Sequence, residues 1–373
     1  MSKYKLIGTE CSLYSGKARA YLRYKDIPFE EVLCTAEVYE TIIIPRIDDR
    51  IIPVMISPDD ICIQDTTEII DFLEERFPEA SVYPETPLQR LVALLFELYG
   101  DEWLLIPAMY YRWWFKDDNH DFIVGEFGRT TMPDAPSEIQ RAAGEMGAKL
   151  FGGMLPGLGA TEKNHKQIEE WYESFLDFFS EHLKSHPFLL GTKPSIGDFG
   201  LMGPLYAHLY RDPYPGRLMK SRAPLVAKWV ERMNAPDPNS GEFLPADEVP
   251  ETLHPILKMM FDEMFPPMLD TVEKLGEWLD ENSGEAIPEL LGQHEFSVRG
   301  VTALRNIRPY NQWMFQRPID YYQSLSGADK ERADDFLKAL DGYEGMQVNI
   351  RRRVKRENHK LLPDIEGAKS WKS

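Results

Sequence analysis

The sequence predicts a small mixed α/β domain at the amino-terminal end, an all-helical domain after it, and an additional, mainly helical extension. Strand and helix patterns alternate through residues 1–80, whereas residues 87–235 contain helical patterns and no convincing strand. A polar, proline-rich stretch at 234–250 then leads into residues 241–373, where helical patterns resume. The length of 373 residues fits two or three domains of ordinary size.

The first 80 residues have the order βαβ, then a β-hairpin, then a helix, which predicts a small sheet covered by helices. The turn Pro58-Asp59-Asp60 joins the two strands of the hairpin, and Pro28 and Pro78 follow the two helices that they terminate. The expected strands are 4–8, 29–34, 51–57 and 61–63, and the expected helices are 15–25 and 66–77.

Helical periodicity dominates the rest of the chain. The helices expected in the second domain are 88–114 with an interruption at Pro107, 137–150, 164–186, 195–209 and 223–233. In the extension, a long amphipathic helix is expected over 252–282, and charged helices over 328–340 and 345–362.

Composition narrows the possible functions. The net charge of -19 and a pI near 4.9 disfavour nucleic acid and an anionic membrane surface as partners. No run of about 18 apolar residues predicts a membrane span, and the first residues lack the apolar core of a signal peptide. The histidines and cysteines show no metal-ligand spacing, so no metal is expected. Three cysteines indicate free thiols and a cytoplasmic, reducing location.

Residues 8–15, with the sequence GTECSLYS, join the first expected strand to the first helix. At such a junction, free backbone N–H groups and the helix dipole stabilise negative charge. The pKa of Cys11 would be lowered there, and Ser12 could donate a hydrogen bond to the thiolate of a bound ligand. Alternatively, Cys11 is a small buried apolar residue and Ser12 is an ordinary helix cap.

Two further features point to groups that a peptide-like ligand could use. A proline at the head of a central strand, Pro53, is tolerated when its peptide bond is cis, which would leave the backbone of Ile52 free for a ligand. Asp65 and Thr66 open a helix, where Thr66 can hold a carboxylate and Asp65 can pair with an ammonium group. An edge-strand proline and an ordinary cap by Thr66 are the simpler alternatives.

Together these features resemble the glutathione transferase superfamily over residues 4–80, and the helical pattern extends the resemblance, more weakly, to about residue 235. The CSL run is similar to the loop of beta-class members, whose functional cysteine falls on Cys11. The same tract also resembles SPYS-type members, whose activating serine falls on Ser12. The resemblance implies a thioredoxin-like, glutathione-binding domain (1–80), an all-helical domain (87–235), a homodimer, and glutathione as co-substrate.

The resemblance also implies roles for single residues. Ser12 would activate the glutathione thiol, whereas Cys11 would act if the chemistry is thiol transfer. The residues implied in glutathione binding are Ile52, Pro53, Asp65, Thr66 and, for the glycine carboxylate, Arg46, with Arg50 as an alternative. Ser195 and Asp198 match the structural capping box of the superfamily's helical domain. Leu13 departs from the proline of SP-type loops, and residues 241–373 match no known part of the family.

A transferase of this kind needs a second pocket for the electrophile, and aromatic side chains suit a flat apolar substrate. The residues expected to line it are Tyr14, Tyr110 and Trp114, although the spacing within 110–115 places at least half of those aromatics in the core. In the extension, arginines 299, 305, 308 and 317 alternate with aromatic residues across 297–322. They could close over the cleft and bind an anion, but a buried strap against the acidic body is favoured. The basic run 351–356 reads as a solvated helix face.

Three functions follow. The favoured one is a glutathione-dependent transferase or lyase that attacks a small apolar or aromatic electrophile, as in detoxification. The second is glutathione-dependent thiol-disulfide oxidoreduction through Cys11. The third is a glutathione-transferase fold that binds or assembles without catalysis, because a fold alone does not determine activity.

Overall fold

The computed structural model describes residues 3–364 and begins with a four-stranded sheet in the order β2-β1-β3-β4. β1 (Tyr4–Gly8) runs parallel to β2 (Phe29–Leu33) and antiparallel to β3 (Val54–Ile56). β4 (Cys62–Gln64) completes a hairpin with β3 across the expected turn at 58–60. All four expected strands are therefore confirmed.

The two faces of the sheet are covered by different elements, as the alternation of side chains along a strand requires. Leu6 and Met55 point into the main core, to which α1 (Leu13–Tyr24) and α4 (Thr66–Arg76) contribute. Ile7 and Val54 point to the other face, where the isoleucine-rich tract after β2 forms α2 (Ala36–Val38), η1 (Tyr39–Ile43) and α3 (Ile44–Ile47).

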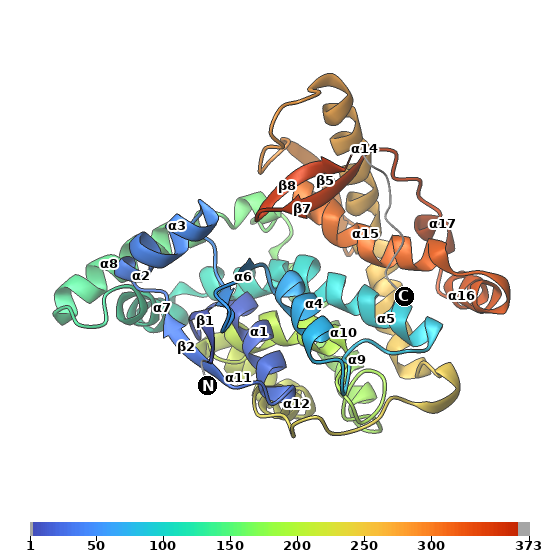
Figure 1. The fold of residues 1–373 in the computed structure, drawn as a ribbon, viewed down its shortest axis with the longest axis horizontal. Helices are drawn as coiled ribbons and strands as arrows, with labels where there is room; N and C mark the ends of the chain where they lie inside the picture. The colour runs from blue at the N-terminus through green and yellow to red at the C-terminus, as the bar shows by residue number, and fades with distance from the viewer. Residues whose placement is uncertain (1–2, 365–373) are drawn as a thin grey trace.

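The second part is helical, and none of its residues lies in a named strand. Its helices are α5 (Pro87–Leu98), η2 (Tyr99–Trp103), α6 (Leu105–Trp114), α7 (Lys116–Thr131), α8 (Ser137–Gly152), η3 (Pro156–Leu158), α9 (His165–His182), α10 (Ile196–Ala207), α11 (Pro213–Arg222) and α12 (Pro224–Asn234). α10 packs against both α1 and α5 (Figure 1). A Cβ on Gly100 would lie 2.3 Å from the carbonyl carbon of Gly200, so glycine is required where η2 crosses α10.

A capping box and an interruption are two features that the sequence predicts for these helices. The capping box is confirmed: the Asp198 carboxylate accepts a hydrogen bond from the Ser195 N–H at 2.8 Å, at the start of α10. The interruption expected at Pro107 was wrong. It falls at η2, while Pro107 lies in the first turn of α6, where a missing N–H removes no hydrogen bond.

The extension packs on α5 and is joined to α4 by ion pairs, and it is mixed rather than purely helical (Figure 1). Its elements are η4 (Pro245–Asp247), η5 (Glu251–Leu253), α13 (His254–Met259), η6 (Met260–Met264), α14 (Phe265–Glu281), β5 (Gln293–Val298), β6 (Val301–Asn306), α15 (Pro309–Ser324), α16 (Gly327–Ala339), α17 (Tyr343–Met346), β7 (Arg353–Glu357) and β8 (Lys360–Asp364). The long helix and the first charged helix are confirmed, with 254–281 helical throughout. No described helix is long and apolar enough to cross a membrane.

The helix expected over 345–362 was wrong beyond α17, because β7 and β8 form a hairpin there. Asn358 and His359 both have positive φ, the geometry of a tight hairpin turn. The Gln316 side chain of α15 bonds both peptide groups of Val354, accepting at 3.0 Å and donating at 2.8 Å, which replaces a partner strand. The basic run is likewise no solvated helix face, since Arg356 is largely buried against Glu68.

Candidate functional site

Ser12 lies at the amino-terminal end of α1, where it forms the N-cap. Its φ and ψ are extended, and its Oγ accepts a hydrogen bond from the Ser15 N–H at 3.3 Å. The side chain is half-buried. The Ser12 hydroxyl hydrogen is not used by this cap, so it can be donated to a negatively charged atom at the positive end of the helix dipole.

The helical domain fixes the loop that carries Ser12. The Arg112 guanidinium donates to the Cys11 carbonyl at 2.9 Å and is itself held by Asp212 through bonds of 2.6 and 2.8 Å. Thr9 and Thr130 share a hydrogen bond of 2.9 Å. Sequence reasoning missed these supports, because no local pattern links Arg112 to a carbonyl that lies 101 positions earlier.

Cys11 lies in the same loop but is buried, with 3% of its surface exposed. Burial raises the pKa of its thiol, and the opposing effects of Arg112 and of the Thr9 hydroxyl do not offset it. This direction is opposite to the lowered pKa that the helix end predicts. In this structure the loop therefore keeps Cys11 as a thiol, and all three cysteines are free.

Pro53 lies beside the start of this loop. The Ile52–Pro53 peptide bond is cis, as the sequence suggested. A Cβ on Gly8 would lie 3.9 Å from the Pro53 Cβ, which places the proline next to the end of β1. Ile52 is half-buried and Pro53 is buried.

Asp65, rather than Thr66, is the N-cap of α4, so the alternative of a Thr66 cap was wrong. Its Oδ1 accepts from the Thr67 N–H at 2.8 Å, and Thr66 is a buried first-turn residue. The Oδ2 accepts from the Tyr310 hydroxyl of α15. The oxygen expected to meet a ligand ammonium group is thus in contact with the extension.

Strand β7 of the extension makes further contacts near Asp65. The Arg356 guanidinium lies 3.1 Å from the Glu68 carboxylate and also bonds the side chain of Gln64. From α15, Arg317 pairs with Asp71 at 2.8 Å. Arg317 therefore fits the strap interpretation of 297–322, and Arg317 and Arg356 both connect the extension to α4.

Arg46 has an acidic partner in the N-terminal domain. It pairs with Asp60 of the β3–β4 turn at 2.7 Å, and a third of its side chain (33%) is exposed. The alternative, Arg50, pairs with Glu40 on the surface. Both arginines thus have acidic partners within the N-terminal domain.

The three residues expected to line the acceptor pocket do not form one wall. Tyr110 and Trp114 are in contact, with ring centroids 5.3 Å apart, but Tyr110 is fully buried and its hydroxyl bonds Glu169 of α9. Tyr14 donates instead to the Asp101 carbonyl in η2 at 3.1 Å. Tyr110 therefore belongs to the core, as the spacing of the aromatic tract allowed.

Lys17 was not anticipated as a buried charge. It is 0% exposed, and its Nζ lies 2.6 Å from the Asp101 carboxylate and 2.8 Å from that of Glu97. The two carboxylates raise the pKa of Lys17, so it is held as a cation behind Ser12. Only the apolar spacing of α1 was visible in the sequence, and it gave no sign of this network.

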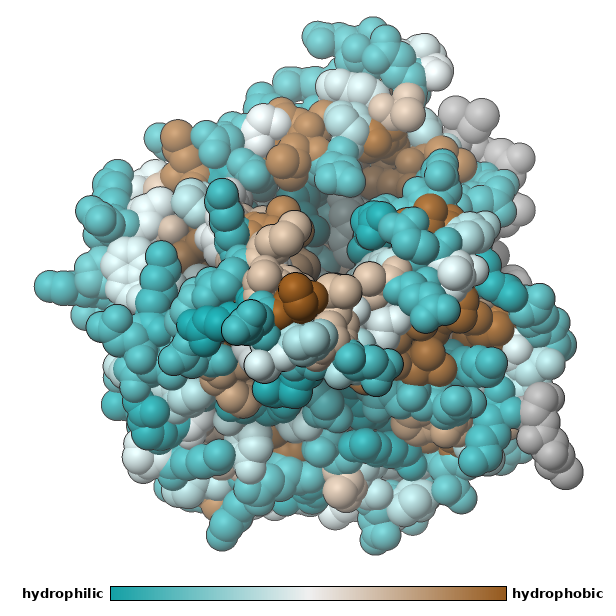
Figure 2. Space-filling model, turned by 90° about the vertical axis from the view of Figure 1, so that its left-hand side faces the viewer, coloured by the Kyte–Doolittle hydropathy of each residue, from teal (hydrophilic) through white to brown (hydrophobic). Residues whose placement is uncertain are grey.

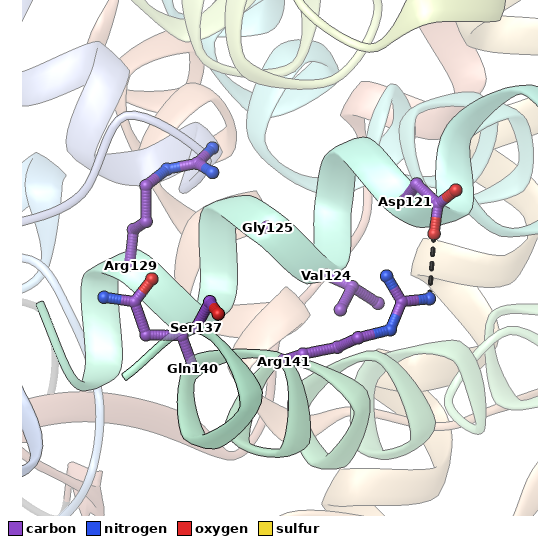
Figure 3. Close-up of a pocket in the computed structure, with 7 residues that line it drawn as sticks. All are labelled: Asp121, Val124, Gly125, Arg129, Ser137, Gln140 and Arg141. Carbon is purple, nitrogen blue, oxygen red and sulfur yellow. Dashed lines mark hydrogen bonds and ion pairs between the residues drawn. The ribbon is translucent and has the colours of Figure 1, made fainter. Parts of the chain in front are cut away.

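The described residues also form a shallow pocket between α7 and α8 (Figure 3). The Asp121–Arg141 ion pair of 2.9 Å crosses it. None of the predicted site residues lines this pocket, and its arginines are solvent-exposed. No group of three or more metal-binding side chains occurs within residues 3–364.

A thioredoxin-like sheet with a capped α1, followed by a helical domain that fixes the loop before α1, defines the two-domain class of glutathione-binding folds. Comparison with protein families agrees. Residues 6–81 match the family model "Glutathione S-transferase, N-terminal domain", and residues 166–232 match "Glutathione S-transferase, C-terminal domain". These two segments of the chain are therefore similar to the two domains of glutathione S-transferases.

Among solved structures, the chain is similar to a glutathione S-transferase from Rhodospirillum rubrum F11, at 16% identity and a TM-score of 0.42, covering 66% of this chain and 96% of that one. A Tau-class enzyme from mango, Mangifera indica, matches at 21% identity and 0.41, covering 67% and 94%. Beta-etherase LigF from Sphingobium sp. strain SYK-6 matches at 19% and 0.44, covering 64% and 97%. No curated protein matches the sequence.

Proposed function

We propose that the protein is a glutathione-dependent transferase in which Ser12 stabilises the glutathione thiolate. The observation that carries the proposal is the position of Ser12 as the N-cap of α1, inside the segment that matches the family's N-terminal domain. A hydroxyl donor and a helix N-terminus lower the free energy of a thiolate at that point. The sulfur then forms a bond to an electrophilic carbon, and the leaving group departs with its electron pair.

The other contacts to glutathione are also part of this proposal. The backbone of Ile52 and the α4 N-terminus at Asp65 and Thr66 are the proposed partners of the peptide, with Arg46 for its glycine carboxylate. Because Tyr310 already bonds Asp65, the γ-glutamyl ammonium group would have to displace that hydroxyl. The acceptor would be a small apolar or aromatic electrophile, as in detoxification.

A homodimer and a cytoplasmic location belong to the same proposal. The three free cysteines support a reducing compartment. Light scattering on the purified chain would measure the assembly: a mass near 43.1 kDa would contradict the dimer.

A binding protein without catalysis is the second candidate, and one observation favours it. Tyr310 and Arg356 of the extension contact Asp65 and its neighbours directly, where a peptide would bind. The oxidoreductase alternative through Cys11 is disfavoured, because burial raises the pKa of its thiol.

Calorimetry with glutathione, followed by turnover of 1-chloro-2,4-dinitrobenzene, tests the proposal. We expect binding, and we expect Ser12→Ala to lower kcat by roughly 10- to 1,000-fold, the scale for losing one donor to a developing anion. Cys11→Ala is the matched control and should retain turnover. Absence of heat at millimolar glutathione would support the binding protein, and unchanged turnover in Ser12→Ala would remove Ser12 from the mechanism. A glutathione adduct on Cys11, detected by mass spectrometry, would favour the oxidoreductase.

A further inference from the structure

Arg305 in β6 is a buried guanidinium with unpaired donors. Only 3% of the residue is exposed, and neither Nε nor Nη1 has a hydrogen-bond partner. Its guanidinium carbon lies 5.2 Å from the ring centroid of Trp103 and 5.7 Å from that of Phe296. These rings stabilise the cation through their faces, but they do not satisfy the N–H groups at the edge of the guanidinium plane.

Two further charges act on this guanidinium without touching it. Burial and the neighbouring Arg308 lower the pKa of Arg305 to about 10, and Glu102 opposes them. Glu102 is buried as well, and both arginines act on it through space. Among residues 3–364, no ion pair within 4.0 Å joins Glu102 to either arginine. Separation of these charges inside the protein leaves Arg305 without the partner that a buried cation normally has.

One residue of α1 lies within electrostatic reach of this cluster. The charges of Glu102 and Arg308 both act on the Tyr14 hydroxyl. Tyr14 is the second residue of α1, two positions after the Ser12 cap. Arg308 is the N-cap of α15 and is half-buried, two residues before the Tyr310 that contacts Asp65. The face seen in Figure 2 is hollowed near its centre, on the side where α2, α3 and α8 lie in Figure 1.

Leaving two donors of a buried cation unpaired costs free energy, which a bound anion would recover. A planar guanidinium matches the two oxygens of a carboxylate, and a second arginine beside it strengthens the match. Among residues 3–364, other arginines such as Arg90 and Arg232 leave one buried guanidinium nitrogen without a hydrogen-bond partner, whereas Arg305 alone leaves two.

We propose that Arg305 and Arg308 form a binding site for the carboxylate of a small molecule held between the extension and the Tyr14 end of α1. The inference rests on the proposed function for the identity of that molecule. The carboxylate belongs either to an aromatic acceptor or to glutathione itself. With 4-chloro-3-nitrobenzoate as acceptor, the thiolate forms the carbon–sulfur bond, chloride leaves with the electron pair of the carbon–chlorine bond, and the carboxylate is unchanged.

Calorimetry with 4-chloro-3-nitrobenzoate and with its neutral analogue 4-chloro-3-nitrobenzamide, both without glutathione, tests the site alone. We expect the wild-type protein to prefer the carboxylate. Arg305→Met and Arg308→Gln should each weaken the benzoate by roughly 10- to 100-fold, the scale of a charge-assisted hydrogen bond, and leave the amide unchanged. Arg351→Gln is the matched control, because it removes an exposed arginine of the same extension.

A parallel titration with glutathione identifies the source of the carboxylate. If the variants weaken glutathione rather than the benzoate, the site holds the tripeptide; if they weaken the benzoate, it holds the acceptor. Failure of the protein to bind glutathione would contradict the proposed function and leave the benzoate result intact. Equal binding of acid and amide, together with glutathione affinity that no variant changes, would overturn the inference.

Thermal unfolding separates ligand binding from support of the fold. Arg305→Met removes an unpaired buried charge, so we expect its Tm to equal or exceed that of the wild type. A lowered Tm with unchanged binding would show that Arg305 is structural. Arg308 is half-buried, so Arg308→Gln carries the binding test if Arg305→Met does not fold.

Discussion

The Tyr310 hydroxyl is the residue-level obstacle to a glutathione site of the usual kind. It occupies the Asp65 oxygen that is proposed to receive the γ-glutamyl ammonium group. The helix cap uses Oδ1 of Asp65, so it does not compete with a ligand for Oδ2. The Tyr310 hydroxyl does compete, because it is bonded to Oδ2. Whether the Tyr310 hydroxyl leaves Oδ2 of Asp65 therefore determines whether glutathione can bind without a movement of α15.

Tyr310→Phe should increase the affinity for glutathione. The variant keeps the ring, which packs against Trp313 and lies beneath the Arg356 guanidinium, and removes the hydrogen bond to Asp65 that the ligand must displace. A gain of roughly two- to tenfold in the calorimetric association constant is expected, the scale of one net hydrogen bond. Tyr343→Phe in α17 is the control. Unchanged or weaker binding in Tyr310→Phe would show that the ligand does not use Asp65.

At the scale of elements, α5 shows how the extension supports the helical domain. Thr86, the N-cap of α5, makes no side-chain cap bond. The carboxylate of Asp247 supplies the cap from the extension, accepting from the Leu88 N–H at 3.0 Å and the Gln89 N–H at 2.9 Å. A segment more than 150 positions away thus completes this helix start.

Asp247→Ala should lower the free energy of unfolding by about 1–3 kcal/mol, since it removes a cap and leaves buried N–H groups unpaired. Urea denaturation at pH 7 measures the change. Asp237→Ala, at an exposed position in the same connecting stretch, is the control. Equal loss in the two variants would mean that the cap contributes nothing specific.

The elements themselves were largely predictable where the signal is local. The strands, the hairpin turn and the Ser195–Asp198 box depend on neighbouring residues, and the structure has them. The β7–β8 hairpin was not predictable, because its strands gain their partner from Gln316 and their basic side chains gain acids far along the chain. From its charged composition alone, the segment resembles an exposed helix.

The candidate site shows the same difference between local signals and contacts with distant residues. The position of Ser12 at the end of a helix could be inferred from sequence, and the N-cap is present. The burial of Cys11 was one of two alternatives that the sequence left open, and the contacts of its loop with Thr130 and Arg112 come from another domain. The extension's contact with Asp65 also joins residues whose proximity no sequence pattern encodes.

At the scale of the whole molecule, His182 links the helical domain to the extension and makes stability depend on pH. Its Nε2 lies 3.0 Å from the Phe188 carbonyl, and its Nδ1 lies 2.8 Å from the Thr252 hydroxyl. Burial lowers the pKa of His182 to about 4. The unfolded chain therefore binds a proton near pH 6.5, while the folded chain does so only near pH 4.

Because the unfolded state binds more protons in that interval, stability should fall as the pH decreases from 6.5 to 4, by up to about 3 kcal/mol from this group. Urea titrations across the interval measure the slope. His182→Gln should reduce the slope by up to one proton. A slope that is identical in wild type and His182→Gln would contradict this linkage.

The contact between Tyr310 and Asp65 spans 245 positions, and that between Arg356 and Glu68 spans 288. During synthesis, the amino-terminal domain can fold as soon as it leaves the ribosome. Its ligand-facing end, however, reaches the form described above only after the segment that contains Arg356 has been translated. A nascent chain, or a product shortened by a premature stop codon, would therefore present an open Asp65 that the finished protein covers.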